Sequence, residues 1–213
     1  MSDVVQMKKI EKPASKSKQV NDFLKNNHVL LAVILAVIVL GVIGYTVVFN
    51  IYTNGVKTSL DKIEVIEYTL TKDAADITDE SLIAQRQDTA LSNVEPFLQK
   101  SGIVGARAGM LAADIYMQRS DWEKSRDLWL MAASKCKGSY LESLCSFNAA
   151  NCLEELGENE KALECYTAVA NDKEFLDRSR AWFSAGRIKE VLGDWEGAKA
   201  VYESIASLEY SSD

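Results

Sequence analysis

Residues 120–133 read SDWEKSRDLWLMAA, and the same pattern returns as GENEKALECYTAVA at 157–170 and as GDWEGAKAVYESIA at 193–206. Each stretch begins at a turn residue, has a small residue five places later and a large aromatic residue four places after that. The small residues are Ser125, Ala162 and Ala198, and the aromatic residues are Trp129, Tyr166 and Tyr202. A period of this length predicts helical hairpins that stack into a solenoid, because one hairpin cannot bury its apolar face alone.

Small residues also recur in the helices predicted before each stretch, at Ala113, Ala150 and Gly186. Small side chains allow two helices to approach closely, and the large aromatic residue fills the space beneath the next hairpin. Ser120-x-x-Glu123 and Ser139-x-x-Glu142 are typical of capping boxes at helix starts. The sequence therefore predicts an all-α protein that includes an α-solenoid of about three hairpins.

A second feature is the uncharged run of 21 residues at 29–49, VLLAVILAVIVLGVIGYTVVF. At about 1.5 Å per residue, such a helix spans roughly 30 Å, the thickness of the hydrocarbon core of a bilayer. A cleaved signal peptide is the main alternative, but its apolar region is usually about 7–15 residues long and ends at a small-x-small cleavage site. A buried core helix is the other alternative. We expect a permanent transmembrane anchor.

The lysines around this run predict its orientation. Six lysines precede it and three follow closely: Lys8, Lys9, Lys12, Lys16, Lys18 and Lys25 before, and Lys57, Lys62 and Lys72 after. Positive charge is retained on the cytoplasmic side, so the N-terminus is predicted to be cytoplasmic and the C-terminal part to lie outside.

The formal net charge of −7 argues against a general nucleic-acid-binding protein, which needs a basic surface.

These features divide the chain into four predicted parts. They are a cytoplasmic lysine-rich tail at 1–27, a transmembrane anchor at 28–52, a helical spacer or degenerate repeat at 53–103, and the repeat domain at 104–213. In the spacer, one apolar helical face is predicted at Leu60, Ile63, Tyr68 and Leu70, and another at Leu82, Leu91, Val94 and Leu98. We expect a helical hairpin there, with its turn at 74–78.

No residue pattern predicts catalysis, a cofactor or a metal site. The chain has one histidine, His28, and lacks a glycine-rich phosphate loop, a G-x-S-x-G elbow and an H-E-x-x-H motif. The four cysteines, Cys136, Cys145, Cys152 and Cys165, form no C-x-x-C pair. We expect them to be buried thiols acting as small apolar residues, with a disulfide and a catalytic thiol as the alternatives. The protein is predicted not to be an enzyme.

The repeated residues resemble the tetratricopeptide repeat (TPR) family over about residues 104–210. The family signature combines small residues, a turn containing glycine, and aromatic residues at helical spacing. Two departures occur in the first unit, where Ser120 replaces the turn glycine and Gly109 replaces a large residue. The resemblance implies a protein-interaction module in which the first helix of each hairpin lines a concave surface.

The repeat register places four rows of side chains across that surface. The predicted protein-binding groove consists of Arg107, Met110, Asp114, Met117, Leu144, Phe147, Asn151, Glu154, Arg180, Phe183, Arg187 and Glu190. Met110, Phe147 and Phe183 form the apolar row, and charged or polar residues flank it. Such a surface would suit an extended or helical segment of another protein. The alternative is that Phe147 and Phe183 are ordinary packing residues.

The order of parts is similar to that of the YfgM-like proteins, from the tail segment DFLKNN at 22–27 through one anchor and a helical spacer to a few TPR-like units. This resemblance implies a single-pass protein of the bacterial inner membrane with a periplasmic domain. It also implies partners in the SecYEG translocon and a periplasmic chaperone, and a role as an ancillary factor of protein translocation or envelope protein biogenesis. Alternatives are a structural TPR subunit of a larger envelope complex, such as a motor collar or secretion apparatus, and a receptor facing the cytosol from an organelle surface.

Overall fold

The computed structural model describes residues 16–73 and 79–210. Across these ranges the chain forms helices and no strand, so the all-α prediction is confirmed. The helices are α1 (Lys16–Thr71), α2 (Glu80–Leu98), α3 (Gly102–Gln118), α4 (Trp122–Lys135), α5 (Tyr140–Glu155), α6 (Asn159–Asn171), α7 (Arg178–Val191) and α8 (Trp195–Tyr210). The turn predicted at 74–78 and the first three tail lysines lie outside the described residues.

The chain divides into two compact units, Met1–Asn54 and Gly55–Asp213, and the division falls within α1. In the first unit, the helix is long and apolar enough to cross a membrane, with a mean hydropathy of 2.8 over its most apolar window and no part of that window buried. The Thr46 hydroxyl donates to the Ile43 carbonyl at 2.8 Å, which satisfies the hydroxyl within the helix, as lipid requires. This segment is consistent with a single-pass membrane anchor.

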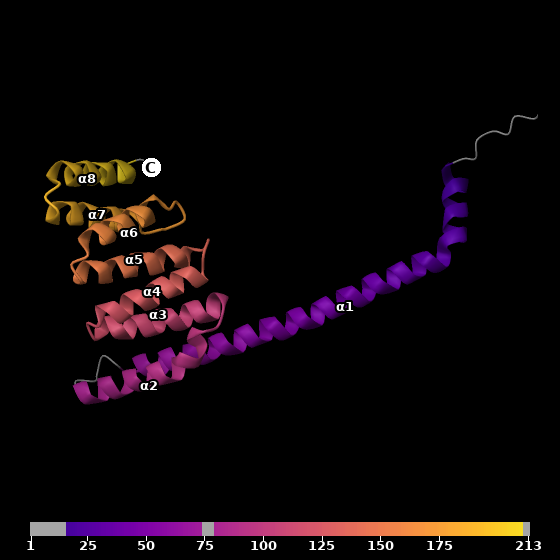
Figure 1. The fold of residues 1–213 in the computed structure, drawn as a ribbon, viewed down its shortest axis with the longest axis horizontal. Helices are drawn as coiled ribbons and strands as arrows, with labels where there is room; N and C mark the ends of the chain where they lie inside the picture. The colour runs from indigo at the N-terminus through magenta and orange to yellow at the C-terminus, as the bar shows by residue number, and fades with distance from the viewer. Residues whose placement is uncertain (1–15, 74–78, 211–213) are drawn as a thin grey trace, which may run out of the picture. The chain divides into compact units, whose positions relative to one another are not determined.

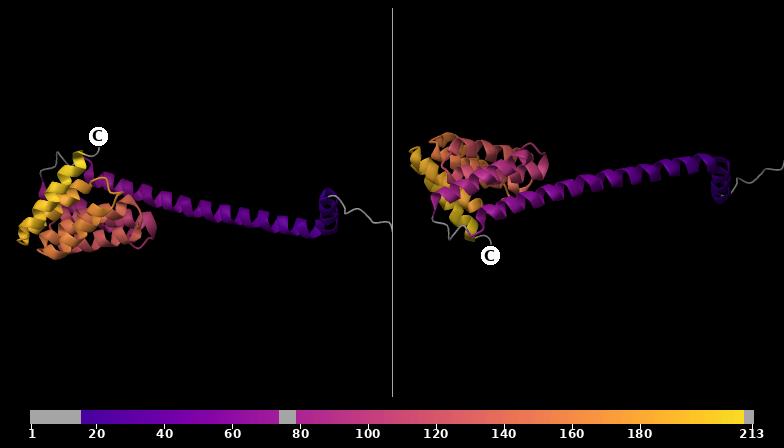
Figure 2. Two further views of the ribbon diagram at one scale, coloured as in Figure 1. Left: turned by 90° about the horizontal axis from the view of Figure 1, so that it is seen from above. Right: turned by 90° about the horizontal axis from the view of Figure 1, so that it is seen from below.

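The second unit is a stack of helical hairpins (Figure 1). From α2 to α8, each helix packs against the next along the chain, and the three hairpins α3–α4, α5–α6 and α7–α8 carry the three repeats. Figure 2 shows the same helices from above and from below. The last part of α1 and helix α2 cover one side of α3 through the buried Ile63, Val94 and Ile115. The predicted solenoid is thus observed.

The turn between the two helices of each hairpin has the same geometry in all three repeats. Ser120, Gly157 and Gly193 have positive φ angles of 57°, 73° and 79°, the left-handed conformation that glycine adopts without strain. At Gly157, the amide donates to the Glu154 carbonyl and the following amide donates to the Leu153 carbonyl, both at 2.9 Å. This is the Schellman motif, and the same bonds recur at the other two turns.

The two capping boxes predicted from the sequence are wrong in detail. Ser120 occupies the left-handed turn position, and the cap of α4 is Asp121, whose carboxylate accepts from the Lys124 amide at 3.3 Å. Ser139 does precede α5, but its hydroxyl donates backwards to the Cys136 carbonyl at 2.6 Å. The prediction for Ser120 is wrong because this residue takes the left-handed position of the Schellman motif that ends α3. The next residue, Asp121, therefore caps α4.

The repeated small and aromatic residues pack as predicted. Ser125, Ala162 and Ala198 are buried, as are Trp129 and Tyr166, whereas Tyr202 in the last helix is half-buried. The Ser125 hydroxyl donates to the Ala113 carbonyl at 2.8 Å, so the one polar member of the set is satisfied across its hairpin. In the third repeat, a Cβ at Gly186 would overlap the Tyr202 ring, which explains why glycine stands there.

Replacing Gly186 with alanine should therefore lower the free energy of unfolding by about 1–3 kcal/mol, because the added methyl group forces the Tyr202 ring and α8 away from α7. Urea unfolding of the full chain, followed by circular dichroism, measures the change. Gly55→Ala is the matched control, since a Cβ at Gly55 meets nothing within 4 Å and alanine favours the helix. Equal stabilisation by both substitutions would contradict this packing.

Candidate protein-binding surface

The residues of the predicted groove lie on α3, α5 and α7, but they are not equally accessible. Phe147 is only 3% exposed, so its place in an open apolar row is corrected. Its ring lies 5.4 Å from the Tyr166 ring and 6.1 Å from the Phe175 ring, measured between centroids. Phe175 comes from the connection between α6 and α7, and it fills the space that the register had left open. Phe147 is a core residue.

Arg180 on α7 covers the outer side of this buried ring. Its guanidinium carbon lies 5.0 Å from the Phe147 centroid, a cation–π contact between α7 and α5. A carboxylate oxygen of Asp177 is 3.7 Å from the guanidinium, while the Arg180 side chain is 65% exposed. The positive charge is therefore presented to solvent directly above the core of the second repeat.

A polar network links α5, α6 and α7 beside this contact. The hydroxyl of the buried Tyr166 lies 2.6 Å from Asn151 Oδ1 and 3.0 Å from Glu154 Oε2. Arg187 Nη2 donates to the same Glu154 oxygen at 2.8 Å, and Arg187 Nη1 donates to Glu154 Oε1. Three predicted groove residues, Asn151, Glu154 and Arg187, are thus brought together by a tyrosine that the sequence had assigned to packing alone.

The electrostatics keep this network in one protonation state. Burial raises the pKa of Tyr166, and the neighbouring Glu154 carboxylate raises it further. The hydrogen bond to Glu154 raises the pKa of Arg187. At neutral pH the tyrosine remains a hydrogen-bond donor and the arginine remains charged. The surface between α5 and α7 therefore has a fixed pattern of charge.

Phe183 is the exposed aromatic residue of the predicted row, with 55% of its surface accessible. One side of its ring faces Tyr202, with centroids 5.7 Å apart. Arg180 and Arg187 lie three residues before it and four residues after it, which places all three on one face of α7. We name Phe183, Arg180, Arg187 and Glu154 the α7 patch.

The four predicted groove residues on α3 lie in other surroundings. Arg107 donates to Glu67 Oε2 of α1 at 3.0 Å, and Asp114 accepts from Gln118 at 3.1 Å. Met110 and Met117 are half-buried against the core cluster of the first repeat. Among the described residues, no hydrogen bond or ion pair joins these side chains to the α7 patch. The remaining two predicted residues lie close to the core: Leu144 packs against the second-repeat cluster, and the Glu190 carboxylate helps to raise the pKa of the neighbouring Tyr202.

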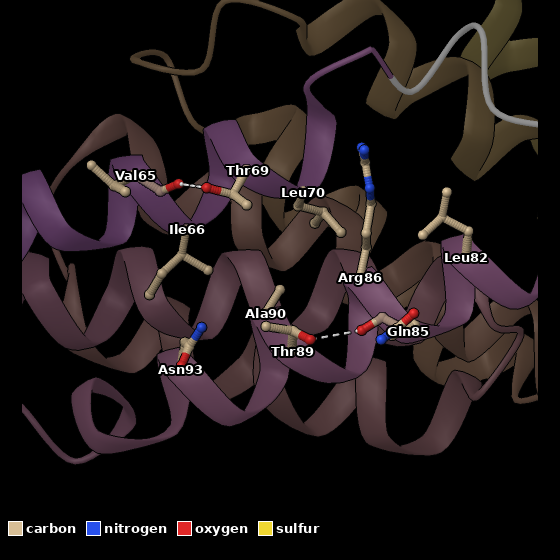
Figure 3. Close-up of a pocket in the computed structure, with 10 residues that line it drawn as sticks. All are labelled: Val65, Ile66, Thr69, Leu70, Leu82, Gln85, Arg86, Thr89, Ala90 and Asn93. Carbon is tan, nitrogen blue, oxygen red and sulfur yellow. Dashed lines mark hydrogen bonds between the residues drawn. The ribbon is translucent and has the colours of Figure 1, made fainter.

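The spacer contains a cavity that the sequence did not indicate. It has a volume of about 320 Å³ and lies between the last turns of α1 and helix α2 (Figure 3). Val65, Leu70 and Leu82 line it, and Arg86 at its rim donates to the Lys72 carbonyl at 2.5 Å.

The apolar face predicted for the first helix of the spacer is observed only in part. Tyr68, predicted on this face of α1, is 61% exposed. Leu60, Ile63 and Leu70 do face the core cluster.

The cysteines are free thiols in this structure, three buried and one, Cys165, half-buried. The Cys152 thiol donates to the Ser125 hydroxyl at 3.3 Å. Within residues 16–73 and 79–210, no group of three histidine, cysteine or acidic side chains is placed to hold a metal ion.

No protein-family model matches the chain. A curated protein of Treponema pallidum (strain Nichols), named TPR repeat-containing protein, is 34% identical over 125 residues. The similar region covers 57% of this chain and 52% of that protein, so the chain spans about half the length of this relative. The similarity supports a TPR protein. It agrees with the three Schellman-terminated hairpins and gives no support to a particular partner such as the translocon.

Proposed function

We propose that the protein is a membrane-anchored protein-interaction scaffold whose TPR-like solenoid binds a segment of another polypeptide. The observation that carries this proposal is the α7 patch, where the exposed Phe183 ring lies between two arginines on one helix face. Aromatic and arginine side chains are the residue types that contribute most to binding energy at protein interfaces. The network through Tyr166 holds Glu154 and Arg187 in place, so little side-chain entropy is lost on binding.

The chemistry of the patch favours a segment that combines an apolar side chain with acidic groups. The apolar side chain would cover Phe183, and a carboxylate would meet the exposed guanidinium of Arg180. Along α3, the predicted groove continues with Arg107, Met110, Asp114 and Met117, and methionine side chains adapt to different apolar partners. We therefore include all three first helices of the hairpins in the proposed binding surface.

We further propose that the protein belongs to a bacterial inner membrane, with the N-terminus in the cytoplasm and the solenoid in the periplasm. The apolar helix supports the anchor, and the excess of lysines before it supports the orientation. Tethering a binding module to a membrane raises its effective concentration near membrane-bound partners. This placement supports a role as an ancillary factor of protein translocation or envelope protein biogenesis, with translocon subunits or a periplasmic chaperone as partners.

In-cell photocrosslinking tests the proposal directly. A photoreactive phenylalanine analogue replaces Phe183, and the matched control carries the same analogue at Leu130, an exposed apolar residue on α4. We expect specific adducts from position 183, containing inner-membrane or periplasmic proteins, and weaker adducts after the added change Arg180→Glu. Adducts of cytosolic proteins would contradict the orientation. Identical adducts from both positions would contradict the binding surface.

A fixed subunit of a larger envelope complex is a second candidate function. It is favoured by three exposed apolar side chains, Val191, Leu192 and Trp195, which gather at the turn between α7 and α8. Exposed apolar clusters mark interaction sites, and permanent interfaces are more apolar than transient ones. A stoichiometric complex that survives high salt would support the fixed subunit, whereas salt-sensitive adducts of many exported proteins would support the scaffold.

A further inference from the structure

Two cysteines lie on either side of the connection between the first and second repeats. Cys136 is the C-cap residue that follows α4, and Cys145 lies in the second turn of α5. Both belong to one buried core cluster, which joins α3, α4 and α5. The connection between them is exposed at residues 137–140 and turns at Gly138, whose φ of 73° is left-handed.

The two thiols interact with each other. Cys136 and Cys145 are neighbours in this cluster, since each side chain contributes to the pKa shift of the other, and the Cys136 thiol donates to the Ala132 carbonyl oxygen at 3.1 Å. Burial raises the pKa of both cysteines, and that of Cys145 rises to about 12, with the neighbouring Cys136 adding to the effect. The neighbouring Ser139 and Cys145 side chains oppose this rise in the pKa of Cys136. Cys136 is 9% exposed beside this connection and Cys145 is 0% exposed, so Cys136 is the thiol that an oxidant reaches first.

The other cysteine pairs do not have this arrangement. Cys145 and Cys152 lie seven residues apart on one helix, so the rise between them is about 10 Å, beyond the Cα separation of a disulfide. Cys152 instead hydrogen-bonds the Ser125 hydroxyl. Cys165 packs against a different core cluster, that of the second and third repeats.

We propose that Cys136 and Cys145 form an intramolecular disulfide when the folded domain meets a disulfide oxidant. The Cys136 thiolate attacks one sulfur of the oxidant, breaks its S–S bond and releases one thiolate. Cys145 then loses its proton, and its thiolate attacks the Cys136 sulfur and displaces the second thiolate. Two cysteine thiols are oxidised with the loss of two electrons and two protons, and the oxidant disulfide is reduced to two thiols.

This bond would join the end of α4 to α5 and so fasten the first repeat to the second. It closes a short loop of the chain, which restricts the unfolded state and stabilises the folded one. We expect the stabilisation to raise the midpoint of thermal unfolding by several degrees. The inference is independent of the proposed binding role, since neither cysteine is among the predicted groove residues and both are buried.

The test uses the full chain, purified in detergent and fully reduced. The protein is incubated with oxidised glutathione, its remaining thiols are alkylated in denaturant, and it is digested with a glutamate-specific protease without reduction. Fragmentation of the linked peptides in the mass spectrometer should place the bond between Cys136 and Cys145, with Cys165 alkylated and with Cys152, which shares a peptide with Cys145, alkylated as well. Alkylation of Cys136 and Cys145, a link to another cysteine, or a link between two chains would overturn the proposal.

Variants separate this disulfide from other effects of oxidation. Cys152→Ser and Cys165→Ala should keep both the linked peptide and the rise in unfolding temperature. Cys145→Ala should lose both, and its small apolar side chain suits the buried position. The peptide map of the unmodified chain remains decisive if this variant folds poorly. An equal rise in unfolding temperature for Cys145→Ala would contradict the assignment.

Discussion

Replacing Tyr166 with alanine should lower the free energy of unfolding by about 3–5 kcal/mol, the largest stability loss that we expect from one substitution in the solenoid. The side chain is fully buried, and its ring packs against Phe147 in the core of the second repeat. Removal of the ring leaves a cavity there, and it also leaves Asn151 and Glu154 without their shared donor. Because native domains are stable by only about 5–15 kcal/mol, this loss is a large fraction of the total.

Two further variants divide this loss into its parts. Tyr166→Phe keeps the ring and removes the hydroxyl, so it should cost about 1 kcal/mol. Tyr202→Ala removes the equivalent ring from the last repeat, where the side chain is only half-buried, and should cost less than Tyr166→Ala. Urea unfolding of each full-length variant, followed by circular dichroism, ranks the three. An equal cost for both alanine variants would show that the second repeat is not the better-packed one.

The solenoid was predictable because its signals are local and repeated. Each turn residue, small residue and aromatic residue lies at a fixed place in a repeat of 36 or 37 residues, so three weak matches support one another. The structure even explains the departure at Ser120, which takes the left-handed position that glycine occupies in the other two repeats. The same fact made the predicted capping role of this serine wrong, because one residue cannot both end a helix and cap the next.

The binding surface was predictable only in part, because periodicity shows which helix face a residue occupies but not what covers it. Phe147 and Phe183 hold the same repeat position, yet Phe175 and Arg180 cover the first and leave the second exposed. Phe175 comes from the connection between α6 and α7, which has no counterpart in the repeat pattern. The cavity beside α2 was missed for a related reason, since it depends on the space between two helices and not on either sequence alone.

The largest expected effect concerns the anchor. Replacing Val37 and Leu40 with aspartate should abolish stable membrane insertion, because each charge near the centre of a spanning helix costs about 2.5–3.5 kcal/mol and the lost apolar side chains add to that cost. Both side chains are exposed in the structure, so no protein contact within the described residues is removed with them. The fraction of protein that remains in the membrane pellet after an alkaline wash measures the effect, and we expect it to fall from nearly all to a small part.

The control exchanges the same two residues, Val37→Leu with Leu40→Val, which preserves composition and volume and should leave the protein in the pellet. N-terminal sequencing of the mature protein separates an anchor from a cleaved signal peptide, since both are apolar helices near an N-terminus. An uncut N-terminus in a wash-resistant pellet is the expected result. If the aspartate variant stays in the pellet, the solenoid itself must hold the protein at the membrane. Substitution of the exposed apolar side chains at the α7–α8 turn, Val191, Leu192 and Trp195, would then test that attachment.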